Sequence, residues 1–71
     1  MANKAEEITR VKHIAYSSSE PVVQTGAIDA LSAYGEQAID AIDEVVNLFD
    51  ISDQVKDHGL RTIEDIKKNS S

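Results

Sequence analysis

A helical pattern that occurs twice along the chain constrains its fold more than any other feature. Apolar and small residues recur with the helical spacing 4, 3, 1 and 3. The first set is Val23, Ala27, Ala30, Leu31 and Tyr34, and the second is Val55, Gly59, Thr62, Ile63 and Ile66. Another apolar helical stripe lies between them: Ala38, Ile39, Ala41, Ile42, Val45, Val46 and Phe49. Two amphipathic helices within one fixed period, here the step from Val23 to Val55, are typical of a stacked helical-repeat array.

We therefore predict an all-α fold in which four antiparallel helices form an α-α superhelix within one domain, residues 1–71. The helices are expected at residues 4–16, 20–34, 37–49 and 53–67, with frayed ends at about 1–3 and 69–71. Ser19 and Ser52 can each accept a backbone N–H from the first turn of the helix that follows. Gly35 suits the left-handed conformation that ends many helices. The centre of the core is predicted to contain Val23, Ala27, Leu31, Ile39, Ile42 and Val46.

The residues from Glu20 to Phe49 resemble one HEAT repeat, of the short, regular type found in phycobilisome-lyase-type proteins. The resemblance is carried by Glu20-Pro21, Val23, Ala27, Ala30, Leu31 and Gly35 in the first helix, and by Ala38 to Ile42 with Val45-Val46 in the second. It is weaker over Ser52 to Ile66, where Asp53 replaces proline and Gly59 replaces alanine. Ile8 to Ala15 looks like the second helix of a preceding repeat. The resemblance implies a protein-binding module rather than an enzyme.

The charge distribution excludes several classes of function. The segment from His13 to Val55 contains eight carboxylates and no lysine or arginine, within a formal net charge of −6. This acidity repels phosphate backbones, so we expect no nucleic-acid partner and instead expect a basic protein surface. The alternative is that the acidity only keeps the protein soluble. Because no apolar run approaches the roughly 20 residues of a membrane span and no cysteine is present, we expect a cytoplasmic protein without a membrane partner.

The third predicted helix carries the main candidate binding surface. Helical spacing places Glu36, Asp40, Asp43, Glu44 and Asn47 side by side on its solvent side. A straight helix offers a cation only two or three oxygens, whereas Ca²⁺ binds six or more. The remaining alternatives are a docking surface for a protein and an ordinary solvated helix face.

Residues typical of catalysis or metal binding are few. His13 and His58 are the only histidines, and neither has a partner in a His-Glu-x-x-His register. The segment 50–53 lacks the central glycine and late glutamate of an EF-hand loop, so we interpret it as a helix cap. We expect no metal, no cofactor and no catalytic residue, and hence no enzyme.

Two glycines fall inside predicted helices, where each costs about 1 kcal/mol relative to alanine. Gly59 lies on the small-residue stripe of the last helix, so a close approach between helices explains it. The sequence pattern gives no reason for Gly26.

Leu60 lies off the Val55–Gly59–Ile63 stripe, so we expect it to be exposed, together with Ile51, where a further repeat helix would pack. A two-fold homodimer that pairs the last helices would bury it. The sequence thus leaves two functions open. One is a small non-catalytic adaptor with an acidic surface for a basic protein. The other is a structural or regulatory subunit that mainly self-associates or joins a larger assembly.

Overall fold

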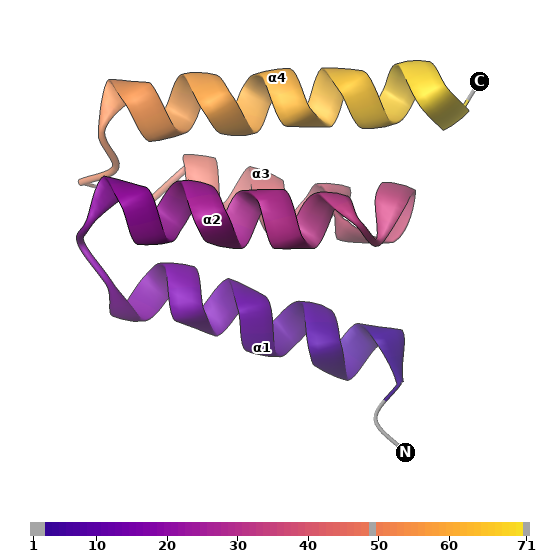
Figure 1. Cartoon of the computed structure of the whole chain (residues 1–71), viewed down its shortest axis with the longest axis horizontal. Helices are drawn as coiled ribbons and strands as arrows, with labels where there is room; N and C mark the ends of the chain where they lie inside the picture. The colour runs from indigo at the N-terminus through magenta and orange to yellow at the C-terminus, as the bar shows by residue number, and fades with distance from the viewer. Residues whose placement is uncertain (1–2, 49, 71) are drawn as a thin grey trace.

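The computed structural model describes residues 3–48 and 50–70, the last by its backbone alone, and contains four α-helices (Figure 1). They are α1 (Lys4–Ser17), α2 (Pro21–Ser32), α3 (Ile39–Val46) and α4 (Asp53–Ser70), and a short 3₁₀ helix, η1 (Gly35–Ala38), precedes α3. No strand occurs in these described ranges. The predicted all-α fold is therefore confirmed. Phe49, which the sequence pattern assigned to the third helix, and the end residues 1, 2 and 71 lie outside the described residues.

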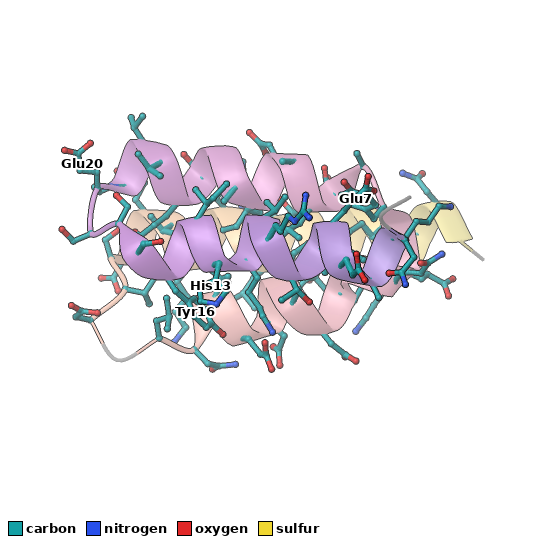
Figure 2. All side chains as sticks on the ribbon, turned by 90° about the horizontal axis from the view of Figure 1, so that it is seen from below. Glu7, His13, Tyr16 and Glu20 are labelled. Carbon is teal, nitrogen blue, oxygen red and sulfur yellow. The ribbon has the colours of Figure 1, made fainter. Side chains whose placement is uncertain are left out.

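Helices α2 and α3 lie at the centre, and α1 and α4 cover them from opposite sides (Figures 1 and 2). Each helix runs antiparallel to the one before it, so that α2 and α4 point the same way (Figure 1). The molecule is a flat block with principal dimensions of 30 × 29 × 17 Å. Consequently α2 and α3 each have several helical neighbours, whereas α1 and α4 each keep an outer side on the surface.

The first helix begins at a polar cap, whereas the second does not. The side chain of Asn3 accepts a hydrogen bond from the backbone N–H of Glu6 at 2.9 Å, which starts α1. The predicted Ser19 cap of α2 is wrong, because Glu20 occupies the cap position and makes no side-chain capping bond. Ser18 is the serine used in this connection: its Oγ accepts from the Glu20 N–H at 3.1 Å. Its carbonyl accepts from the side chain of buried Gln24 at 3.0 Å, which ties the connection to α2.

The connection between α2 and α3 begins earlier than predicted and contains a 3₁₀ helix. Gly35 adopts a φ of 67°, which confirms the left-handed conformation expected there. However, α2 ends at Ser32, and the predicted third helix begins as η1. The backbone N–H groups of Ala33 and Tyr34 bond to carbonyls three residues back, at 3.3 and 3.0 Å. Such bonds tighten a helical end and satisfy carbonyls that would otherwise lack partners.

Helix α4 begins as predicted and ends later. Ser52 Oγ accepts the N–H of Val55 at 3.3 Å, which confirms the predicted cap. The helix continues past the predicted end at Lys67, as far as Ser70. Lys67 and Lys68 lie in its last turn, where cations interact favourably with the helix dipole.

The core agrees with the predicted stripes except on part of α2. Four of the six residues predicted at its centre are buried: Ala27, Leu31, Ile42 and Val46. Val23 and Ile39 are only half-buried, and Ala30 is exposed. Gln24 and Ile28 are buried instead. The reason is that α2 contacts α1, α3 and α4, so its buried sector is wider than, and rotated from, the stripe visible in the sequence.

The two helix-interior glycines have opposite surroundings. A Cβ at Gly59 would overlap Cγ1 of Val46 and would lie 3.3 Å from Cδ1 of Ile28, so α4 approaches the central pair closely there. This confirms the reason expected for Gly59. A Cβ at Gly26 would meet nothing within 4 Å. The fold of the chain therefore does not require glycine at position 26.

Candidate functional site

Four of the predicted binding residues form one exposed surface, which we call the acidic α3 surface: Glu36, Asp40, Asp43 and Asn47. Glu36 belongs to η1, the next two residues to α3, and Asn47 follows α3 directly. They share one side because the opposite side of α3 contributes Ile42, Val45 and Val46 to the core. Among the described residues, no ion pair involves Glu36, Asp40 or Asp43. These three carboxylates are therefore available to an external basic group.

Glu44, the fifth predicted residue, is also exposed but already has a basic partner in the same chain. Its Oε2 lies 2.6 Å from Nζ of Lys12 on α1. The Tyr16 hydroxyl donates a longer hydrogen bond of 3.4 Å to the same oxygen. Glu44 therefore differs from the acidic α3 surface beside it in being paired, and its ion pair links α1 to α3.

The surroundings of Lys12, Glu44 and Tyr16 shift the pKa values of all three groups. The hydrogen bond from Lys12 and its positive charge lower the pKa of Glu44. The same hydrogen bond raises the pKa of Lys12. Burial raises the pKa of the Tyr16 phenol, and the neighbouring Glu44 charge adds to this effect. At neutral pH the carboxylate and the ammonium group are thus both held in their charged forms.

Asn47 has a structural role at the end of α3. Its side-chain amide donates a 2.8 Å hydrogen bond to the carbonyl of Asp43. The backbone N–H of Asn47 bonds to the same carbonyl at 3.2 Å. Asn47 therefore closes the last turn of α3, and its place on the acidic α3 surface follows from that role.

A second interhelical pair joins α4 to α2. His58 Nε2 and Asp29 Oδ1 lie 2.7 Å apart, with both side chains partly exposed. Sequence reasoning missed this pair and the Lys12–Glu44 pair. The sequence carries no local signal for either pair, because the partners lie on helices that only the packing brings together.

Metal binding finds no support in the side-chain geometry. Within the described ranges, no group of three or more histidine, cysteine, aspartate or glutamate residues could hold a metal ion. His13 lies on the outer side of α1, near its edge toward α3, while Glu7 lies at the opposite edge (Figure 2).

No helix of the described chain has both the length and the apolar character that a membrane crossing requires.

Exposed apolar side chains mark further surface regions. Leu60 on α4 is 45% exposed, which confirms its predicted exposure, and Ile51 is half-buried. Ile14 on α1 is 53% exposed. Among the described large apolar residues, Val22 is the most exposed, at 80%. Leu60 and Ile14 therefore lie on the two outer helices, on opposite sides of the block.

The chain matches no protein-family model, no curated protein and no solved structure. The resemblance to HEAT repeats therefore stays a prediction from the sequence, and the function has to be argued from the surfaces of the molecule.

Proposed function

We propose that this chain is a small, non-catalytic HEAT-like module that binds a basic protein surface through the acidic α3 surface. The observation that carries the proposal is the contrast within α3 itself. Glu44 already has Lys12 as its basic partner, whereas Asp40 and Asp43 have none among the described residues. Asp40 lies in the first turn of α3, where the helix dipole favours a carboxylate. Asp43 lies beyond that turn and three positions from this like charge, which lowers helix stability slightly, so helix stability does not account for Asp43.

Binding of this kind relies on long-range attraction. Exposed carboxylates speed the encounter with a basic surface, and salt screens that attraction over about 8–10 Å. They add less to the lifetime of the complex, because exposed ion pairs contribute little free energy once formed. The partner surface should therefore present lysine or arginine opposite α3, together with apolar groups that provide affinity.

The test is to capture partners on the immobilised protein, identify them by mass spectrometry, and measure association rates at several salt concentrations. The variant Asp40→Asn/Asp43→Asn should associate several-fold more slowly, with a weaker dependence on salt. It should fold normally, because both side chains are exposed.

The matched control is Glu20→Gln/Asp50→Asn in the connections before α2 and α4, which removes the same charge from two other exposed carboxylates. It should leave the partner's association rate close to that of the wild type. Equal slowing by both variants would mean that only net charge matters. That result would reduce the acidic α3 surface to an ordinary solvated helix face.

The alternative function is a structural or regulatory subunit that mainly associates with itself. The exposure of Leu60 on the outer helix α4 favours it, because an apolar side chain there gains from a second protein surface. Light scattering separates the two functions, since the adaptor requires a foreign protein in the complex and the self-associating subunit does not.

A further inference from the structure

The exposed apolar residues on the outer helices each correspond to a buried residue one repeat away. Leu60 on α4 is the counterpart of Ile28 on α2, just as Val55 is the counterpart of Val23. Ile28 is fully buried, whereas Leu60 is 45% exposed. Ile28 is covered because α4 packs beside α2, with the Ile28 side chain against Gly59. No described helix lies beside α4 in the way that α4 lies beside α2. Leu60 is therefore exposed at a position equivalent to one that is buried on α2.

The same relation holds at the other side of the block. The spacing Ile8, Val11, Ile14 and Ala15 on α1 repeats on α3 as Ile39, Ile42, Val45 and Val46. Val45 is fully buried, because α3 has α1, α2 and α4 as neighbours, whereas its counterpart Ile14 is 53% exposed. Helix α1 therefore lacks a neighbour that α3 possesses.

The ion pair between α1 and α3 also has a counterpart one repeat on. In the register that matches Ile14 with Val45, Lys12 corresponds to Asp43 and His13 corresponds to Glu44. Repeating the Lys12–Glu44 contact would therefore bring Asp43 of one chain next to His13 of another. A histidine N–H can donate a hydrogen bond to a carboxylate, so the repeated contact is chemically complementary. Both residues are exposed in the single chain.

We propose that the acidic α3 surface and the outer side of α4 bind α1 and α2 of a second copy of this chain, so that copies associate head to tail. In this arrangement α1 of the second copy lies against the acidic α3 surface, and its α2 covers Leu60 as α4 covers Ile28. Leu60 and Ile14 then become buried as Ile28 and Val45 already are. Asp40 and Asp43 face Arg10 and His13 of the next copy. The inference rests on the proposed function, since it names the basic partner of the same acidic surface.

Charge complementarity favours this arrangement over a two-fold dimer. Pairing two identical α4–α3 surfaces would bring the acidic residues of both copies to one interface, and like charges across an interface disfavour association. Pairing unlike surfaces brings α3 carboxylates to the exposed Arg10 and His13 of α1. Such an interface is heterologous, and it continues until a ring closes or a filament forms.

The experiment uses two single variants, Ile14→Asp and Leu60→Asp, in light scattering from micromolar to millimolar concentrations. The wild-type mass should rise above the 7.7 kDa of one chain as the concentration increases. Each variant alone should stay at 7.7 kDa, because each has lost one of the two unlike surfaces. An equimolar mixture should form a heterodimer and stop there, since each variant still carries the surface that the other needs.

The charged contact provides a second, independent measurement. Asp43→Arg should lower the association constant several-fold, and the double variant His13→Asp/Asp43→Arg should recover most of it. Val22→Asp is the control: Val22 is 80% exposed, and Gln54, its counterpart one repeat on, stays exposed although α4 packs against α2. Its association should match that of the wild type. Circular dichroism checks that every variant remains helical.

Three results would overturn the inference: a wild type that stays monomeric up to millimolar concentration, an Ile14→Asp variant that still dimerises, or a mixture of variants that forms no heterodimer. The second result is the signature of a two-fold α4 interface. Failure here is distinguishable from failure of the proposed function. The double variant Ile14→Asp/Leu60→Asp keeps Asp40 and Asp43, and its capture of a basic foreign protein would preserve that function without self-association.

Discussion

The two outer helices cover the same central pair by different means. Helix α4 attaches through an unbroken buried stripe of Val55, Gly59, Ile63 and Ile66, and Gly59 brings its backbone close to α2 and α3. Helix α1 has only two buried residues, Ile8 and Ala15, and adds the exposed Lys12–Glu44 ion pair.

The difference shows what a shared repeat spacing does and does not determine. It places apolar residues toward the central pair on both sides of the block. The strength of attachment depends on side-chain size and on how closely the backbones approach. We therefore expect α1 to open more readily than α4, since exposed ion pairs add little to stability.

The largest expected effect comes from truncating a core side chain of the central helix pair, against which both α1 and α4 pack. Ile42 is fully buried in the central pair. Truncating such a side chain costs about 2–5 kcal/mol, so Ile42→Ala should release α1 and α4 together and unfold much of the domain. Urea denaturation followed by circular dichroism measures the loss. A midpoint equal to that of the wild type would show that the core assignment is wrong.

The two glycines give a matched pair of intermediate effects with opposite signs. Gly59→Ala should destabilise the fold by about 1–3 kcal/mol, because the added methyl group overlaps the β-branched side chain of Val46. Gly26→Ala should stabilise it by about 0.5–1 kcal/mol, since the site is open and alanine favours helix. Thermal unfolding of both variants provides the measurement. If both variants changed stability in the same direction, the close approach of α4 at Gly59 would not explain why α4 attaches differently from α1.

The smallest expected effect concerns α1 and appears in the pH dependence of stability. The pKa of Glu44 is lowered from its ordinary value of 4.5, so its contribution is present above that value and is lost as the pH falls through the lowered pKa. The pKa of Lys12 is raised from 10.5, so its contribution is present below that value and is lost as the pH rises through the raised pKa. Melting temperatures of the wild type and Glu44→Gln should therefore differ most near neutral pH and converge at both extremes. Hydrogen exchange should show faster opening of α1 in the variant, with α4 unchanged. A constant temperature difference at all pH values would contradict a role for the ion pair.

The helices were predictable from the sequence because each is encoded locally. The spacing of apolar residues, Pro21, Gly35 and Ser52 together located four helices to within a few residues. The Ser19 cap was predicted wrongly because adjacent serines compete for the same connection, and only the path of the chain decides that Ser18 bonds. The buried position of Ile28 was missed because it depends on α4, which comes one full repeat later in the chain.

The candidate site was predictable as a surface but not as a set of partners. Helical spacing correctly placed Glu36, Asp40, Asp43 and Asn47 on one exposed side. It could not separate Glu44 from them, since the Lys12 side chain that engages it comes from another helix. Exposure follows from the residue's own helix, whereas pairing depends on the packing between helices.

The order in which the helices pack has a consequence for the rate at which the chain folds. The main helix contacts join elements that are adjacent or next but one along the chain. Chains dominated by such local contacts close short loops, lose little entropy before contacts form, and fold in microseconds to milliseconds. The α1–α2 and α3–α4 pairs can each form before the two pairs meet. An early intermediate of this kind exposes little backbone to intermolecular pairing, because each helix satisfies its own hydrogen bonds.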